Sequence, residues 1–246
     1  VMSTWARHLY EHDPLAIAKG EVNDYSVINI FGYQPLVGTD AICIWENPTA
    51  YVVPTSAVVM TLVSTSALDA GAMRVIVRGV AADYSYLQEI VTMNGVTPVN
   101  TTNAFLAINN LIIISSNVAR TANEGVITAT NGGITYGQIN VGIGQSQMSQ
   151  YTVPLGFSYY LTRVNSFAQQ NGGVNNYNTY SVEATSPNIT YTVLQSPYFQ
   201  SYEAVRVVPF RYLEKTSVQW RSRTQTNTSA VGMVIEGILI QEAGPL

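Results

Sequence analysis

The chain is poor in charged residues, and this shortage argues against several classes of function. Asp, Glu, Lys and Arg make up only 11% of its 246 residues, against roughly 25% in an average soluble protein. The 11 Lys and Arg residues are outnumbered by 15 Asp and Glu residues, which gives a net charge of −4. Because binding to nucleic acid requires a broad positive surface, we expect no nucleic-acid partner. The 47% hydrophobic content argues equally against a disordered chain.

Cysteine and long apolar runs are also scarce. The chain has one cysteine, Cys43, so it forms no intramolecular disulfide, and the flanking Ile42 and Ile44 predict a buried thiol. The aliphatic run at 111–114 is only as long as a strand, far short of the ~20 residues that a membrane helix needs. We therefore expect no membrane partner. No basic stretch followed by an apolar one lies near the start, so we also expect no signal peptide.

Motifs for catalysis and cofactor binding are missing or poorly placed. Residues 8–12 fit the pattern H-x-x-E-H of some zinc proteases, with His8 and His12 on one helix face and Glu11 as the base. Pro14 ends such a helix at once, and no later helical segment could supply a third ligand. The chain contains no G-x-S-x-G pattern and no Gly-Lys pair of a phosphate-binding loop. We therefore expect no enzyme activity, no catalytic residue, no metal and no cofactor.

Strand patterning dominates the chain from about residue 25. Short runs rich in Val, Ile, Thr and Tyr are separated by Gly, Pro, Asn or Ser roughly every 8–12 residues, which is typical of an all-β protein and suggests about twelve to fourteen strands. Asn94-Gly95 predicts a tight hairpin turn. Pro98 cannot donate to a ladder, so it predicts that the returning strand lies at a sheet edge. The clearest strand segments are 57–63, 73–80, 88–93, 105–114, 125–130, 157–164, 191–194, 204–208, 217–223 and 231–240.

A polar stretch rich in Gln and Ser at 145–150 divides this pattern into two parts. We predict an all-β fold of two β-sandwich or jelly-roll-like units, a first β unit over residues 25–147 and a second β-sandwich unit over residues 148–246. A short N-terminal arm, residues 1–24, precedes them, and we expect a helical turn at 15–20 within it.

Low charge combined with many neutral polar residues and 16 tyrosines is typical of a protein that other subunits cover. Neutral hydrogen bonding avoids the cost of burying unpaired charge, and aromatic side chains supply contact area at interfaces. We therefore predict a homo-oligomer, in which copies of the chain are each other's partners. The predicted interface residues are Trp5 and Tyr10 in the arm, Trp45, Asn175 and Tyr177 in the uncharged loop 171–177, and Trp220, Arg221 and Arg223.

Several segments together resemble a group of virion structural proteins of tailed bacteriophages. They are Gly79–Tyr84, Gln88–Val99, Phe105–Asn110, Gly144–Met148, Tyr151–Pro154 and Val208–Val218. The resemblance covers roughly residues 25–245, and its motifs are strands and turns. It implies a non-enzymatic structural protein located in the virion, most specifically a capsid decoration or cement protein. It also implies other capsid or tail proteins as partners, and a trimer is the favoured assembly.

Three alternatives remain open at this point. A tail-fibre or neck module could use its tyrosines to stack on glycans. A glycosidase would need two carboxylates placed in space, and Glu183, Glu203 and Glu214 are available in the second unit. An extracellular sheath or pilus-like subunit is disfavoured by the expected lack of a signal peptide. The aromatic residues concerned are Tyr159, Tyr160, Tyr177, Tyr180, Tyr191, Tyr198, Phe199 and Tyr202. We expect roughly a third of them to be ordinary core or surface strand residues, and for the others we favour subunit contacts over glycan binding.

Overall fold

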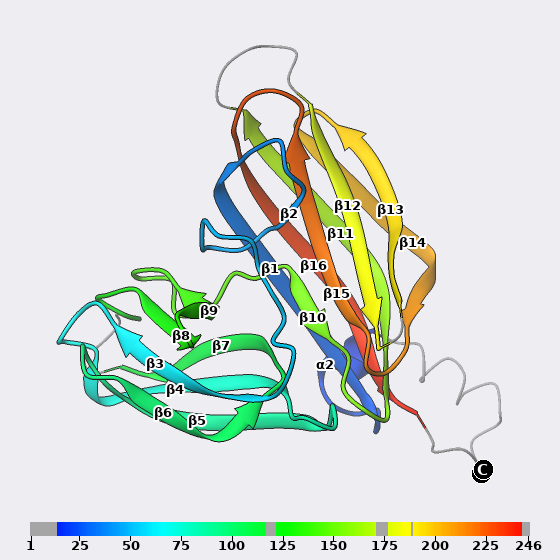
Figure 1. Ribbon diagram of the computed structural model, residues 1–246. Coiled ribbons are helices and arrows are strands. Elements are labelled where there is room, and N and C mark those ends of the chain that lie inside the picture. Colours follow the sequence, from blue (N-terminus) through cyan, green and yellow to red (C-terminus); the bar gives the residue numbers. More distant parts are fainter. Residues whose placement is uncertain (1–13, 117–121, 171–176, 188, 243–246) are drawn as a thin grey trace, which may run out of the picture.

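The computed structural model describes residues 14–116, 122–170, 177–187 and 189–242. Within these ranges the chain forms one short helix and sixteen strands, arranged as four antiparallel sheets. Figure 1 shows a tall sandwich with a smaller β unit beside its lower half. The predicted all-β fold built from β-sandwich units is confirmed.

The elements alternate between long strands and short connections. The helix is α2 (Pro14–Ala18), at the place where a helical turn is expected. The strands are β1 (Tyr25–Val37), β2 (Ile42–Cys43), β3 (Val58–Ser64), β4 (Ala70–Val80), β5 (Tyr86–Asn94), β6 (Val99–Phe105), β7 (Ala107–Ser115), β8 (Ile127–Asn131), β9 (Ile134–Ile139), β10 (Gln150–Thr152), β11 (Phe157–Gln170), β12 (Asn178–Ser186), β13 (Ile189–Tyr198), β14 (Ser201–Tyr212), β15 (Ser217–Thr224) and β16 (Ser229–Gln241).

The tall sandwich packs two sheets face to face. One sheet has the strand order β1-β16-β11-β14, and the other has the order β10-β15-β12-β13 with β2 added on β15. Alternate residues of each strand point into the space between the sheets, as the period of two along a strand requires. Trp220 lies at the centre of this core, where its ring meets the edges of Tyr159 and Tyr212 at centroid distances of 6.2 and 6.4 Å.

The first strand of the sandwich completes a sheet made otherwise by the C-terminal half of the chain. β1 pairs along its length with β16, from Tyr25 opposite Ile240 to Gln34 opposite Val231. β2 likewise pairs with β15. Residues 25–43 therefore lie in the tall sandwich, so strand pairing crosses the predicted division into 25–147 and 148–246. Local patterning indicates a strand but does not specify its partner, because that partner is about two hundred residues away in the chain.

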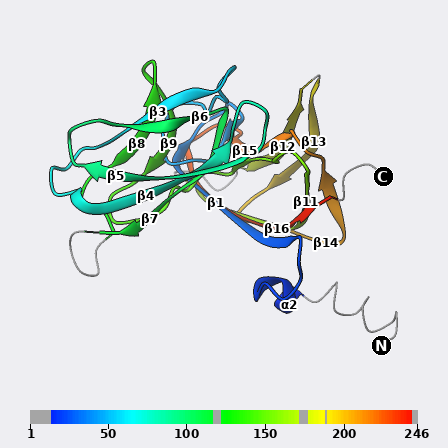
Figure 2. The same ribbon diagram turned by 90° about the horizontal axis from the view of Figure 1, so that it is seen from below.

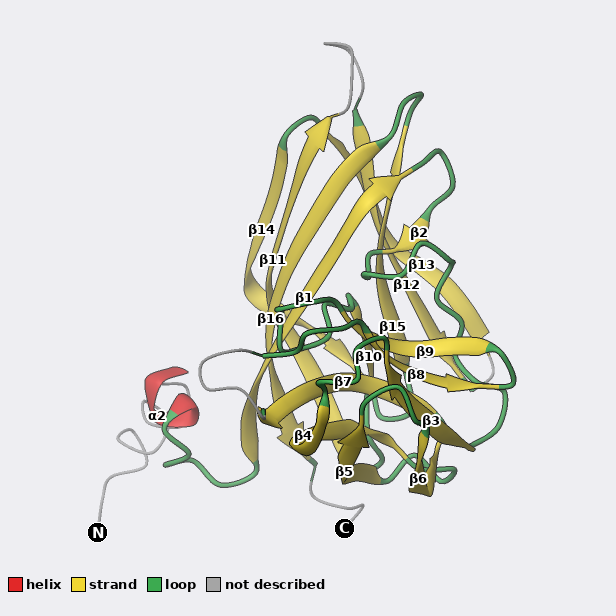
Figure 3. Cartoon of the chain, turned by 90° about the vertical axis from the view of Figure 1, so that its left-hand side faces the viewer, coloured by secondary structure: helices red, strands yellow, loops and turns green. Residues whose placement is uncertain are grey.

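The smaller unit is a second sandwich, formed by residues 58–139. Its sheets have the orders β6-β3-β8-β9 and β5-β4-β7, and Figure 2 shows them as two layers beside the tall sandwich. Met60, Met73, Phe105 and Leu111 are fully buried between the layers. Figure 3, seen from the side, shows α2 outside the sheets at the lower end of the tall sandwich.

The two units are joined by residues 44–57, between β2 and β3, and by residues 140–149, between β9 and β10. Trp45 forms an isolated bridge with Met148, and its ring meets the edge of Tyr51 at 5.2 Å. The Ser149 hydroxyl accepts from the Ile44 amide at 2.9 Å and donates to the Trp220 carbonyl at 2.6 Å. The chain before the small unit and the chain after it are thus bonded to each other beside the core of the tall sandwich.

Cys43 contributes to this junction as a buried side chain. It is 2% exposed and packs with Trp45, Tyr51 and Met148. Burial raises the pKa of its thiol to about 12, since a thiolate would lose its hydration there. The expected buried thiol is confirmed.

The turn predicted at Asn94-Gly95 forms, but it does not join two strands of one sheet. Gly95 has a φ of +59°, and the Thr97 amide donates to the Asn94 carbonyl at 3.0 Å. β5 before the turn and β6 after it lie in different sheets, so the predicted hairpin is wrong. Pro98 has no amide hydrogen to extend a ladder next to β5. β6, which follows it, is an edge strand as expected.

Replacing Gly79→Ala should destabilise the small unit. A Cβ at this position would lie 1.9 Å from the Ala107 carbonyl oxygen, in the backbone of the paired strand β7. We expect a loss of about 1–3 kcal/mol in the free energy of unfolding, measured with urea. Gly38→Ala is the matched control, because a Cβ there meets nothing within 4 Å. Equal stability of the two variants would contradict the close packing of β4 on β7.

Candidate interaction surfaces

The eight predicted interface residues fall into three groups. Trp5, Tyr10 and Asn175 lie outside the described residues. Trp45 and Trp220 lie in the interior of the protomer. Tyr177, Arg221 and Arg223 reach the surface of the tall sandwich. Only the last group has described side chains that a second molecule could touch.

The assignment of Trp45 and Trp220 to a subunit interface is corrected by the structure. Both side chains are 0% exposed, so neither can contact another subunit. Trp220 points inward because it is in phase with Val218 on β15, and the inward face of this strand packs on the core. Trp45 is covered by the junction of the two units, where its indole N–H donates to the Thr49 carbonyl at 2.8 Å.

Three of the seven tyrosines assigned to subunit contacts are also core residues. Tyr159, Tyr180 and Tyr198 are 0%, 1% and 5% exposed. Tyr180 stacks on Tyr202 with a centroid distance of 4.9 Å. These side chains occupy inward positions of β11, β12 and β13, where large rings fill the space between two sheets about 10 Å apart. Burial raises the pKa of Tyr159 and of Tyr180 well above the usual value.

Arg221 and Arg223 lie together on the outer face of β15. Arg221 is ion-paired with Glu183 of β12 and also donates to the Ala41 carbonyl. Both arginines line a shallow hollow of about 140 Å³. Its other lining residues are Ala41, Ser181, Val182, Glu183, Thr192 and Gln195. Most of these side chains are polar, which fits a contact made through hydrogen bonds more than through apolar area.

Tyr177 lies just before β12 and close to Arg223 in the pairing register. Thr179, two residues on, is opposite Arg223. The Tyr177 ring is half-buried and meets Phe199 at 6.4 Å with the ring planes at 70°. Phe199 is 61% exposed. This pair presents aromatic surface at the end of the sandwich.

A surface that sequence reasoning missed lies on β14, the edge strand of its sheet. Leu161 pairs with Phe210 and Arg163 pairs with Val205, so residues 206–209 lie opposite the single residue between Leu161 and Arg163. The extra residues form a bulge, which pushes side chains away from the sheet. Val205, Val207 and Val208 are 68%, 98% and 81% exposed. We call these three residues the valine ridge.

The chain around the valine ridge is held in place. The Arg206 guanidinium lies over the Phe210 ring, 5.7 Å from its centroid. On the other side of the bulge, Arg163 of β11 is ion-paired with Glu203 at 2.8 Å. The segment Val205–Pro209 is readable in the sequence as a strand rich in Val. The bulge cannot be predicted from this segment, because it depends on how β14 pairs with β11.

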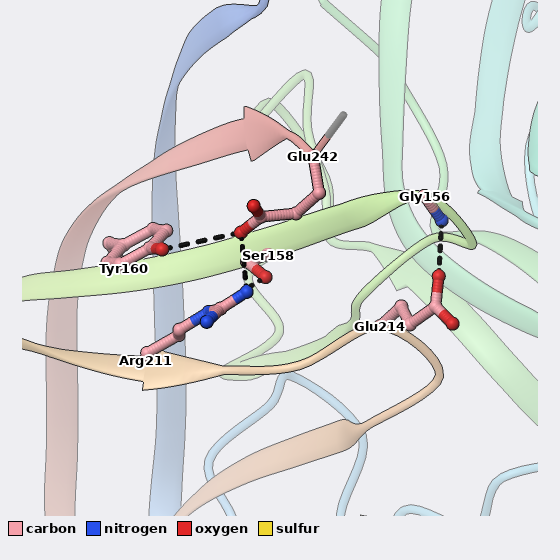
Figure 4. Close-up of polar contacts among 6 residues, drawn as sticks. All are labelled: Gly156, Ser158, Tyr160, Arg211, Glu214 and Glu242. Atoms are coloured by element: carbon pink, nitrogen blue, oxygen red, sulfur yellow. Dashed lines mark hydrogen bonds and ion pairs between the residues drawn. The ribbon is translucent and has the colours of Figure 1, made fainter. Parts of the chain in front are cut away.

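A polar network fixes the lower end of the same sheet (Figure 4). Arg211 of β14 pairs with Glu242 at 2.7 Å and donates to the Ser158 hydroxyl at 3.1 Å. The Tyr160 hydroxyl donates to Glu242 at 3.3 Å. The Ser158 hydrogen bond and the Arg211 charge lower the pKa of the Glu242 carboxyl. Glu214 accepts from the Gly156 amide at 2.7 Å, which anchors the turn between β14 and β15.

One carboxyl group is buried near the junction of the two units. Glu46 is 4% exposed; its Oε2 accepts from the Asn140 amide at 3.2 Å, while its Oε1 is buried without a partner. Burial raises the pKa of Glu46 to about 7. Glu46 also lines a hollow of about 370 Å³ on the outer face of β1, β16 and β11.

A second concavity lies between the two units. This cleft of about 520 Å³ runs along the free edge of β1, opposite β7 and the segment 145–148. Asn29, Asn109, Asn110 and Gln145 contribute amide groups to it. Among the described residues, no group of three or more His, Cys, Asp and Glu side chains is placed to hold a metal ion. No helix within the described ranges is long and apolar enough to cross a membrane.

Comparison with known proteins adds little. No protein-family model matches the chain, and no curated protein matches it. Among solved structures, the chain is similar to one titled "Structure of infectious bursal disease virus Gt strain". The two chains are 9% identical with a TM-score of 0.21, and the match covers 98% of this chain and 78% of the other. A similarity this low carries no argument about fold or function.

Trp220→Ala should strongly destabilise the tall sandwich, whereas Arg223→Ala should not. Removing a fully buried indole leaves a cavity beside Tyr159 and Tyr212, and we expect a loss of about 3–5 kcal/mol in the free energy of unfolding. Arg223 is exposed, so its loss should change stability by less than about 0.5 kcal/mol. Chemical denaturation of both variants measures this. A small effect of Trp220→Ala would contradict its role in the core.

Glu46 should make the protein less stable as the pH rises. Its pKa is about 7 in the folded chain and 4.5 as the ordinary value, so the folded state binds the proton more tightly. The protonated carboxyl group therefore stabilises the folded state fully below about pH 4.5, and this stabilisation is lost as the pH rises through about 7. Glu46→Gln should therefore gain up to about 3 kcal/mol relative to the wild type between about pH 5 and about pH 8. Urea unfolding at both pH values tests this, and a constant difference would contradict it.

Proposed function

We propose that the protein is a non-enzymatic structural component of a tailed-bacteriophage particle, most specifically a capsid decoration protein. In this role it stabilises the shell through contacts with copies of itself and with other capsid proteins. The observation that carries the proposal is the valine ridge on an edge strand, with Val207 98% exposed. The resemblance of the strand and turn segments to virion proteins supplies the biological setting.

The valine ridge favours self-association for a simple energetic reason. Covering a valine side chain contributes about 1.5 kcal/mol, so three neighbouring valines contribute appreciably to an interface. The free edge of β14 adds unpaired backbone groups beside them. The low charge of the chain leaves few repulsive contacts between copies. A trimer about a three-fold axis would let each copy cover the ridge of its neighbour.

A second candidate is a tail-fibre or neck module that binds glycans. The pair formed by Tyr177 and Phe199 favours it, because exposed rings at the end of a sandwich can stack on sugar faces. Burial of Tyr159, Tyr180 and Tyr198 leaves fewer rings for this purpose than the sequence suggests. Sugar binding on a glycan array that is lost in Phe199→Ser would favour this candidate over the first.

The double variant Val207→Asp, Val208→Asp tests the proposal. Two carboxylates on the ridge cannot be covered by another subunit without a large desolvation cost. We expect the wild type to sediment as an oligomer whose fraction grows with protein concentration, and the double variant to sediment as a monomer. At low concentrations, where the wild type is also monomeric, the variant should unfold at the same temperature as the wild type, because both side chains are exposed.

Val96→Asp is the matched control. Val96 is 55% exposed but lies on the small unit, away from the ridge. It should sediment as the wild type does. A wild type that remains monomeric at every concentration, or a double variant that associates as strongly as the wild type, would contradict self-association through the valine ridge.

A further inference from the structure

The hollow beside Glu46 combines aromatic surface with a buried carboxyl group. Phe31 and Tyr33 of β1 and Phe167 of β11 contribute the rings. They are 37%, 39% and 50% exposed, although large rings are usually covered in a monomer. The hollow's remaining lining residues are Gly32, Glu46, Asn140, Ile143, Gln147, Gly232, Met233 and Val234.

The backbone of the sheet is adapted to this arrangement. A Cβ on Gly232 would lie 2.3 Å from the Phe167 ring, so the ring rests directly on the strand β16. A Cβ on Gly32 would lie 2.6 Å from the Ile44 carbonyl oxygen, which brings the segment leading to Glu46 close against β1. The two glycines thereby keep the ring and the carboxyl group near the same surface.

Glu46 has capacity for one more hydrogen bond. Its Oε2 accepts from the Asn140 amide at 3.2 Å, and the nearby Gln147 amide also acts to lower the pKa of the carboxyl group. No described donor forms a hydrogen bond of normal geometry with its Oε1. Leaving such an atom buried and unpaired destabilises the folded chain, more so when the group is charged. A donor that entered the hollow and reached Glu46 would remove this destabilisation.

The residues around Glu46 favour a cation as the donor that would bond its Oε1. Among the residues that the structure describes, Tyr33 is the only other titratable one that lines the hollow, and the side chains that line it from 140–147 are neutral. None of the ion pairs found within the described ranges includes Glu46. A carboxylate without a counter-charge attracts a positive group, and ring faces attract it as well. The apolar parts of Ile143 and Val234 suit an alkyl stem.

We propose that this hollow binds the alkyl cation that ends a lysine or arginine side chain of a neighbouring protein subunit. The stem lies against Phe31, Phe167 and Val234, and the positive head group pairs with Glu46. The identity of the partner as a subunit rests on the proposed function, whereas the chemistry of the hollow stands on the residues that line it. Such a contact would add a charged, oriented interaction to the apolar contact of the valine ridge.

The experiment uses 15N-glycine labelling of the full chain. Gly232 lines the hollow directly under the Phe167 ring, and the chain has 18 glycines, so its amide signal reports locally. The probes are n-butylammonium and n-butylguanidinium, with n-butanol as the neutral control of the same length. We expect a saturable shift of the Gly232 amide signal with at least one cation and a weaker response to n-butanol. Which cation binds more tightly distinguishes a lysine-like from an arginine-like ligand.

Glu46→Gln should weaken binding of the cation at least tenfold, because it removes the counter-charge and keeps the shape. The affinity of the wild type should rise between about pH 6 and about pH 8 as Glu46 ionises, and the variant should show no such rise. Glu21→Gln is the matched control, since Glu21 is exposed and pairs only weakly with Lys19 at 3.8 Å. It should bind as the wild type does.

Phe167→Leu provides a second test that does not depend on Glu46. It removes one ring face and should weaken binding several-fold, while thermal unfolding checks that each variant is folded. Equal affinity for n-butanol and the cations, unchanged binding in Glu46→Gln, or no response of the Gly232 amide to either cation would overturn the proposal. Failure of the proposed function has a separate readout, because the valine ridge variants are measured by sedimentation without any probe.

Discussion

The pairing of the first described strand with the last one is the constraint on which the rest of the structure depends. β1 completes the sheet that β16 and β11 begin, and it closes the tall sandwich over its aromatic core. The Gln34 side chain of β1 donates to the Trp45 and Asn47 carbonyls at 3.0 and 2.8 Å. The chain that leads into the small unit is therefore attached to the same strand. This pairing therefore helps to position the smaller sandwich, together with the bonds between Asn109 of β7 and Thr152 of β10.

The shortage of charge has a structural counterpart in how the cores are built. Tyr159, Tyr180, Tyr212 and Trp220 fill the space between the sheets of the tall sandwich, where a typical core uses more aliphatic side chains. At the junction of the two units, neutral side chains form the hydrogen bonds to buried backbone groups. The Ser149 hydroxyl, for example, bonds both the Ile44 amide and the Trp220 carbonyl. Among the described residues, the surfaces that suit partners are the valine ridge, the pair of Tyr177 and Phe199, the arginine face of β15 and the hollow beside Glu46.

Much of the secondary structure could be predicted, because it follows from local patterning. The segments 57–63, 217–223 and 231–240 match β3, β15 and β16 closely. β12 was not predicted, although Tyr180, Val182 and Ala184 alternate inward along it and could have revealed it. Predictions that needed a partner failed more often. The Asn94-Gly95 turn joins strands of different sheets, and the tryptophans assigned to an interface are buried. Residue type and spacing cannot distinguish a ring that packs inside from one that packs against a neighbour.

The amino-acid sequence by itself determined the all-β class, the low charge and the positions of most strands, since each depends on composition or on a period of two. Tertiary structure alone decided which strands pair, which rings are covered and where the valine ridge protrudes. The bulge at residues 206–209 exists only in relation to β11, and the isolated carboxyl of Glu46 exists only because Asn140 and β1 approach it from distant parts of the chain. Both are products of contacts between residues far apart in sequence, and local patterns carry no record of those contacts.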